Sequence, residues 1–175
     1  MLNKIKSSPH IIVAIGLLLI TLAVNISMPL FRVYAAAAQL NNGQTSLVFA
    51  SYVLGMLPCY IFLGGLSDRV GRRPVIIASV LCAFTATLII TIWPNVIALI
   101  FARFFQGVAI GLGMGAGTAY ISELLQPRAQ AATKAAGLAS LFTALGFGGG
   151  ALATSLVLLI HFTPLPFTYY ILLGP

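Results

Sequence analysis

The chain has 175 residues, of which 60% are hydrophobic and only 6% are charged. Soluble domains carry about 25% charged residues, so a soluble globular protein is excluded. Intrinsic disorder requires low hydrophobicity and is excluded as well. The net charge of +7 would suggest a nucleic-acid partner for a soluble protein. Here we assign the basic excess to loops that set the orientation of a membrane protein, and we expect no nucleic-acid partner.

Five apolar runs are each long enough to cross a lipid bilayer, which takes about 20 apolar residues. The predicted spans are residues 10–31, 45–66, 74–93, 95–125 and 134–162, and a shorter apolar stretch, 165–175, starts a partial sixth span. Each span should be a helix, because lipid offers no hydrogen-bond partner to the backbone. The first run exceeds the core of a signal peptide, which has about 7–15 residues, so we expect it to be retained. The sequence thus predicts a single all-α transmembrane domain over residues 1–175, a polytopic helical bundle.

The basic residues indicate the orientation of this bundle. Seven of the nine fall on one side when the N-terminus is cytoplasmic: Lys4, Lys6, Arg69, Arg72, Arg73, Arg128 and Lys134. Cytoplasmic loops of membrane proteins carry such an excess of lysine and arginine. We therefore expect a multi-pass protein of the cell membrane with a cytoplasmic N-terminus, in contact with the lipid bilayer.

The loop between the second and third spans carries the strongest motif. It contains two spaced glycines, one acid and three arginines: Gly64, Asp68, Arg69, Gly71, Arg72 and Arg73. Gly71 can adopt a positive φ, and Asp68 can pair with a nearby arginine or lie against a helix N-terminus. A basic anchor on the cytoplasmic side would explain the arginines. It would not explain the spaced glycines together with the single acid.

This loop resembles the pattern G-x-x-x-D-R-x-G-R-R of the major facilitator superfamily of secondary transporters, and all six pattern residues match. The loop also lies where that family has it, after the second span on the cytoplasmic side. The resemblance implies an N-terminal six-helix half, built from two inverted three-helix repeats, with a substrate site near the bilayer midplane. It also implies that the loop is a conformational switch, which latches the two halves of the transporter in the outward-facing state.

A second motif lies in the fourth predicted span. Arg103 follows Asn95 by eight residues, which places it about 12 Å into a hydrocarbon core of about 30 Å. A charge at such depth costs about 2.5–3.5 kcal/mol or more, so Arg103 should face a cavity; the alternative is that it snorkels to the outer interface. Arg103, Gln106 and Gly107 match the R-x-x-Q-G of the family's fourth span. This resemblance implies a place on the substrate and proton pathway.

Two further sets of residues complete the candidate sites. Glu123 ends the fourth span near the motif loop, where a network with Asp68, Arg72 and Arg128 is reasonable; the alternative is a solvated charge at a helix end. Asn25, near the middle of the first span, either contacts substrate or bonds a neighbouring helix.

Periodic glycines predict close helix contacts, because glycine lets two backbones approach. We expect packing roles for Gly111 and Gly115 in the fourth span and for Gly146 and Gly150 in the fifth. Antiporter-type members carry a proline in the fifth span where this chain has Phe147. This departure from the family pattern leaves the direction of transport open.

The sequence shows no phosphate-binding loop, no nucleophile–base pair and no intramembrane metal cluster. We therefore expect no enzyme activity, no cofactor and no metal. The favoured function is proton-coupled efflux of a small molecule by alternating access. The alternatives are uptake of a sugar or metabolite by the same superfamily, and a truncated membrane protein or assembly partner that transports nothing. A full transporter would need the missing C-terminal half or a second chain.

Overall fold

The computed structural model describes residues 8–37, 40–63, 65–93, 95–126 and 130–160. This part of the chain forms helices α1 (Pro9–Ala37), α2 (Asn42–Phe62), α3 (Leu66–Val70), α4 (Arg72–Ile92), α5 (Val96–Leu125) and α6 (Ala131–Ile160). All of them except α3 are long and apolar enough to cross a membrane. The predicted all-α polytopic fold is therefore confirmed. The expected partial sixth span, 165–175, lies outside the described residues.

The second predicted span differs from the structure at both of its ends. The prediction starts this span at residue 45, but α2 begins at Asn42, because Asn41 and Gln44 form a capping box. Asn41 Oδ1 accepts from Gln44 N at 2.8 Å, and Gln44 Oε1 accepts from Asn41 N at 3.1 Å. These two bonds satisfy backbone donors of the first helical turn. At its other end α2 stops at Phe62, and the separate short helix α3 begins at Leu66.

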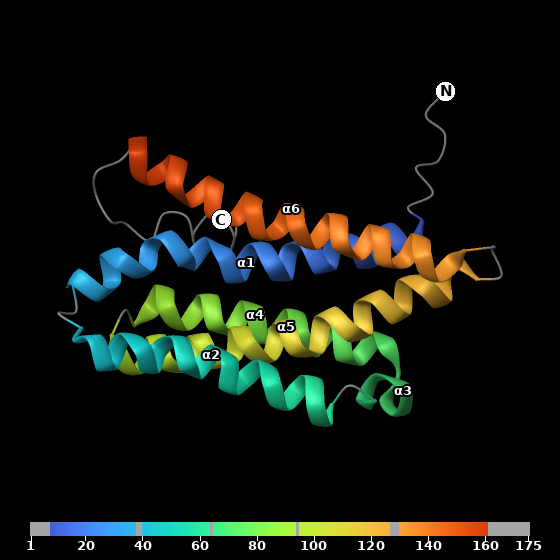
Figure 1. Ribbon diagram of the computed structural model, residues 1–175, viewed down its shortest axis with the longest axis horizontal. Coiled ribbons are helices and arrows are strands. Elements are labelled where there is room, and N and C mark those ends of the chain that lie inside the picture. The colour runs from blue at the N-terminus through green and yellow to red at the C-terminus, as the bar shows by residue number, and fades with distance from the viewer. Residues whose placement is uncertain (1–7, 38–39, 64, 94, 127–129, 161–175) are drawn as a thin grey trace.

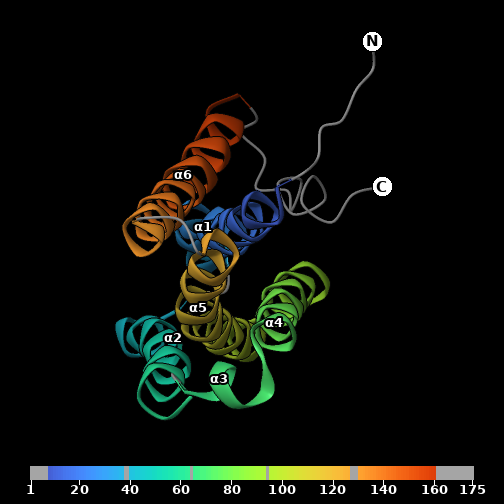
Figure 2. The ribbon, with the colours of Figure 1, turned by 90° about the vertical axis from the view of Figure 1, so that its right-hand side faces the viewer.

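Helix α5 lies in the middle of the bundle and contacts α1, α2, α4 and α6. Figure 2 shows α2 and α4 on either side of α5, with α1 and α6 as a pair above them. In Figure 1, α3 lies at the same end of the bundle as the start of α1 and the junction between α5 and α6. We call this the α3 end, and we call the opposite end, where α4 passes into α5, the far end.

The helices approach closely where glycines meet backbone. A Cβ on Gly55 of α2 would collide with the Phe104 carbonyl oxygen of α5, and one on Gly107 would collide with the Tyr52 carbonyl oxygen of α2. Gly111 continues this contact, since its Cβ would lie 2.5 Å from the Cβ of Cys59. The α2–α5 interface therefore depends on missing side chains.

The α1–α6 interface is built in the same way. A Cβ on Gly146 would lie 2.6 Å from the Leu18 carbonyl oxygen, and one on Gly150 would lie 2.7 Å from the Leu22 carbonyl oxygen. The buried Thr154 hydroxyl also donates to the Ile26 carbonyl at 3.0 Å. The expectation of packing is corrected only at Gly115, where a Cβ would meet nothing within 4 Å. Gly115 points to open space, although it follows Gly111 at the same four-residue interval.

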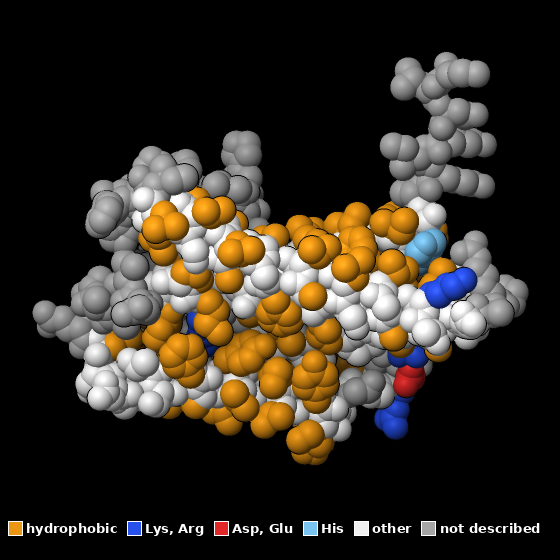
Figure 3. Space-filling model, turned by 45° about the horizontal axis from the view of Figure 1, so that its top comes forward, with side chains coloured by type: hydrophobic (Ala, Val, Ile, Leu, Met, Phe, Trp, Pro, Cys, Tyr) orange, Lys and Arg blue, Asp and Glu red, His pale blue; other side chains and the backbone are white. Residues whose placement is uncertain are grey.

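The outside of the bundle is apolar along its flank and charged at one end. Large apolar side chains point outward, among them Phe62 (78% exposed) on α2 and Leu159 (76% exposed) on α6. Figure 3 shows this apolar flank, with lysine, arginine and acidic side chains gathered at the right-hand end. Such a large exposed apolar surface is unfavourable in water, so this flank is suited to contact with lipid. The chain is a multi-pass membrane protein.

Candidate functional site

The turn between α3 and α4 depends on one glycine. Gly71 has φ of +102°, in the left-handed region, and α4 begins at the next residue, Arg72. A residue with a side chain would be strained in this conformation. The predicted positive φ at Gly71 is confirmed. The turn directs Arg72 from the start of α4 toward both α3 and α5.

Arg72 joins three helices at the α3 end. Its Nη2 lies 2.5 Å from Asp68 Oδ1 of α3, and its Nε lies 2.8 Å from Glu123 Oε1 of α5. Its Nη1 also donates to the hydroxyl of Ser67, a buried residue of α3. These side chains and Gly71 line a polar hollow of about 290 Å³. One guanidinium thus holds the short helix α3 against the last turn of α5.

The other residues of the predicted loop and network have different surroundings. Arg73 donates from Nε to the Tyr120 hydroxyl at 2.9 Å, while Arg69 is exposed on α3. Gly64 and Arg128 lie outside the described residues. Among the described members of the expected network, Asp68, Arg72 and Glu123 are brought together.

Arg103 is buried inside the bundle, toward the far end of α5. Its side chain is 2% exposed. Its Nη1 donates to Gln106 Oε1 at 3.1 Å, and Gln106 Nε2 donates to the Ser27 hydroxyl of α1 at 3.2 Å. Ser27 in turn donates to the Val24 carbonyl at 2.8 Å. A continuous chain of hydrogen bonds therefore runs from the cation on α5 to the backbone of α1.

Two aromatic rings and a thioether also lie close to this cation. The Arg103 Cζ lies 5.8 Å from the ring centroid of Phe31 on α1 and 5.8 Å from that of Phe49 on α2. Arg103 Nη2 lies 3.6 Å from the Met28 sulfur. A guanidinium over an aromatic face is attracted by the negative charge of the ring face. The expected alternative, in which Arg103 snorkels to the interface, is wrong, because its side chain is enclosed by three helices.

The other two residues predicted for the pathway have different contacts. Gly107 lies on the α2–α5 contact described above. Asn25 Nδ2 donates to the Thr21 carbonyl of its own helix at 3.0 Å. This bond lies within α1, and the expected contact of Asn25 to substrate or to a neighbouring helix stays a prediction. Pro29, which lies inside α1, has no N–H for the carbonyl of Asn25 four residues earlier.

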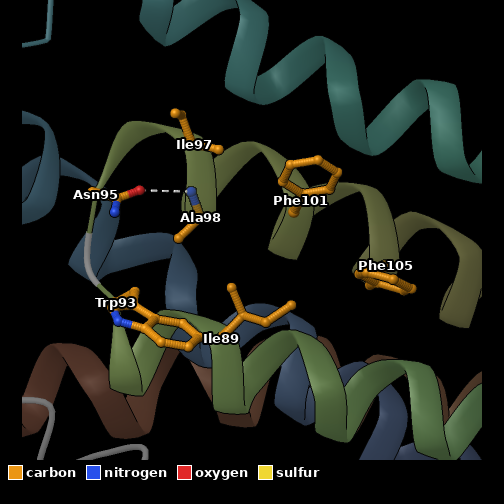
Figure 4. A pocket seen from close by; sticks show the side chains of 7 residues that line it. All are labelled: Ile89, Trp93, Asn95, Ile97, Ala98, Phe101 and Phe105. Atoms are coloured by element: carbon orange, nitrogen blue, oxygen red, sulfur yellow. Dashed lines mark hydrogen bonds between the residues drawn. The ribbon is translucent and has the colours of Figure 1, made fainter.

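An open apolar groove of about 420 Å³ lies at the far end, between α4 and α5. Figure 4 shows Ile89 of α4 and Trp93, which follows α4, on one side of it and Phe101 and Phe105 of α5 on the other. Asn95 Oδ1 caps α5 by accepting from Ala98 N at 2.8 Å. Among the described residues that line the groove, none has a titratable side chain.

No three His, Cys, Asp or Glu side chains gather into a metal site within the described ranges. The sequence reasoning missed Ser67 and Tyr120 at the α3 end, and Ser27, Met28, Phe31 and Phe49 around Arg103. A sequence signal existed for Tyr120, since it precedes Glu123 by one helical turn and shares its face. Phe31 and Phe49 had no such signal, because they come from different helices.

Comparison with known proteins places this sequence in a family. The profile described as Major Facilitator Superfamily matches residues 13–174. Monosaccharide-sensing protein 3 of Arabidopsis thaliana is 38% identical over 44% of this chain and 11% of its own length. Multidrug resistance protein D of Escherichia coli (strain K12) is 32% identical over 59% of this chain and 25% of its own length. The arabinose-proton symporter of Bacillus subtilis (strain 168) is 32% identical over 57% of this chain and 21% of its own length.

Each of these alignments covers a quarter or less of the relative. The family profile, in contrast, covers nearly the whole chain, including the α3–α4 turn and the Arg103 motif. The chain belongs to the major facilitator superfamily.

Proposed function

We propose that the chain forms the N-terminal half of a secondary transporter that exports a small organic molecule in exchange for protons, by alternating access. The observation that carries this proposal is the buried chain of hydrogen bonds from Arg103 through Gln106 to Ser27. A cation within a membrane span costs several kcal/mol, and such residues line substrate or ion pathways in membrane proteins. A bundle that only anchored the protein would gain nothing from this cost.

The α3 end supports a conformational role for the motif loop. Arg72 binds Asp68 and Glu123, which are 60% and 48% exposed. Exposed ion pairs contribute only about 0.2–1 kcal/mol, so they can be exchanged during a conformational cycle. We propose that this network latches the N-terminal half against a C-terminal half in the outward-facing state.

The charges also support an orientation. At the α3 end, Arg69 lies in the last turn of α3, and Arg72, Arg73 and Lys134 lie in the first turns of α4 and α6. Because basic residues concentrate in cytoplasmic loops, we propose that the α3 end, and with it the N-terminus, faces the cytoplasm of a cell-membrane protein. A cysteine at position 69 that is labelled from outside intact cells by a membrane-impermeant maleimide would overturn this orientation.

Transport is tested in cells that overproduce the protein and lack their own exporters. Efflux predicts faster loss of preloaded ethidium and better growth on toxic organic compounds. Both effects should disappear with an uncoupler and in Arg103→Ala, which must reach the membrane at the level of the unmodified protein. Arg103→Lys keeps the charge but loses the planar group and serves as the matched variant. Ethidium loss that the uncoupler leaves unchanged would contradict proton coupling.

Uptake of a sugar or metabolite is the second candidate. It is favoured by the similarity to an arabinose-proton symporter and to a monosaccharide-sensing protein. The same cells should then accumulate labelled arabinose, and Arg103→Ala should abolish the accumulation. This result, together with unchanged ethidium efflux, would replace the first proposal.

A membrane protein that transports nothing on its own is the third candidate. The mass of the native polypeptide in its membrane distinguishes the cases. A mass matching 175 residues would require a second chain for transport. A mass about twice as large would place this sequence in a full transporter, whose secondary-transporter architecture pairs two such repeats.

A further inference from the structure

Phe31 and Phe49 form an aromatic pair that connects two helices at the far end. Their ring centroids are 4.6 Å apart, with the ring planes inclined by 52°. Phe31 belongs to α1 and is 5% exposed, whereas Phe49 belongs to α2 and is 41% exposed. Such inclined aromatic pairs are attractive beyond the apolar area that they bury.

The pair lies over the guanidinium of Arg103. Both ring centroids are 5.8 Å from the Arg103 Cζ, within the range in which a cation is attracted by an aromatic ring. The same head group donates to Gln106 Oε1 at 3.1 Å. The guanidinium therefore has a polar partner on α5 and aromatic neighbours contributed by α1 and α2.

The two rings differ in how firmly they are held. Phe31 packs in a buried cluster with Leu30 of α1, Val48 of α2 and Leu99 of α5. Phe49 is the next residue after Val48, but its ring covers the cation from the more exposed side. A displacement of α2 would carry the Phe49 ring away from Arg103, whereas Phe31 keeps its contacts with residues of α1 and α5.

We propose that Phe49 is a positioning residue, which together with Phe31 clamps the Arg103 guanidinium and controls its access from the far end. This rests on the proposed function in one respect, namely that Arg103 lies on the transport pathway. When α2 carries Phe49 away from Phe31, the guanidinium becomes accessible to substrate. When the rings close again, it returns to its bonded position beside Gln106.

The clamp is tested without a substrate by the arginine reagent phenylglyoxal. Membrane vesicles containing the protein are treated with the reagent, and modification of Arg103 is measured by mass spectrometry relative to the exposed Arg69 in the same sample. In Phe49→Leu, which keeps an apolar side chain but loses the ring, we expect Arg103 to react roughly tenfold faster. Phe49→Tyr, which keeps the ring, should restore the slow reaction.

Phe84→Leu is the matched control, because Phe84 lies on α4 and is 49% exposed, similar to Phe49. It should leave the modification rate of Arg103 unchanged. An unchanged rate in Phe49→Leu, or an equal increase in Phe84→Leu, would overturn the clamp. Phe49→Met gives a second ring-less variant if Phe49→Leu does not reach the membrane, and it carries the same expectation.

Transport separates this inference from the proposed function. If both hold, Phe49→Leu changes the KM for ethidium efflux, and Phe49→Tyr restores the original value. Faster modification of Arg103 in Phe49→Leu combined with normal efflux in Arg103→Ala would support the clamp and refute the pathway role of Arg103. Slow modification in Phe49→Leu combined with lost efflux in Arg103→Ala would refute the clamp alone.

Discussion

Arg73 donates a hydrogen bond from Nε to the hydroxyl of Tyr120, 2.9 Å away. The neighbouring Arg72 binds Glu123, which follows Tyr120 by one helical turn. Two adjacent arginines at the start of α4 are thus bound to one face of the last turns of α5. Two bonds therefore join α4 to α5 at the α3 end. The Arg72–Glu123 bond is an ion pair, whereas the Arg73–Tyr120 bond has a neutral acceptor.

The neutral part of this attachment can be removed alone by Tyr120→Phe. The change deletes one hydrogen bond, worth about 0.5–1.5 kcal/mol, and leaves the ring in place. We expect amide hydrogen exchange in the first turn of α4 to rise by roughly two- to tenfold, because local opening becomes easier by that amount. Tyr60→Phe, at a half-exposed tyrosine on α2, is the control. Equal exchange in both variants would contradict the attachment.

The latch proposal predicts that Asp68→Asn slows transport without reducing the amount of protein in the membrane. Asp68 is 60% exposed, so losing its ion pair should cost at most about 1 kcal/mol of folding stability. Glu123→Gln is the matched variant on the other side of Arg72. Membrane level is measured by immunoblot, and transport by ethidium efflux. Normal efflux in Asp68→Asn would end the latch role of this loop.

The glycine contacts predict opposite results for two positions eight residues apart on α5. Gly107→Ala should destabilise the bundle by about 1–3 kcal/mol, because its Cβ meets the Tyr52 carbonyl oxygen of α2. Gly115→Ala has open space and should be neutral or stabilising by up to about 1 kcal/mol, since alanine favours the helix. Thermal unfolding in detergent measures both. A similar loss in the two variants would show that α2 and α5 do not meet as described.

The polar chain at Arg103 predicts a graded loss of stability. Gln106→Leu removes the acceptor of a buried cation and should cost about 1–3 kcal/mol. Ser27→Ala should cost less, because it removes a hydroxyl one step further from the charge. The same thermal measurement compares them. A larger loss in Ser27→Ala than in Gln106→Leu would contradict the order of bonds along the chain.

The sequence predicted the spans well, because hydrophobic length alone determines which segments can cross lipid. Their ends were predicted less well, although the Asn41–Gln44 capping box is visible in the sequence. The short helix α3 could not be foreseen, since five residues give too little periodicity for a prediction.

Arg72 and Glu123 could be proposed as partners from topology, because both fall at the same end of adjacent spans. The ring pair around Arg103 could not, since no local pattern relates Phe31 to Phe49. Gly115 shows the same limit, because a four-residue interval does not reveal whether another helix faces the glycine.

The pairing of α1 with α6 has a consequence for the order in which the bundle is made. Helix α1 ends at Ala37, whereas its glycine-rich partner begins at Ala131. Ribosomes add about 5–20 residues per second, so α1 waits for several seconds before this partner emerges. During this interval the carbonyls and hydroxyls that later meet α6 are exposed to lipid or to the insertion machinery. Helix α1 thus acquires its α6 contacts only after α2, α4 and α5 have been made.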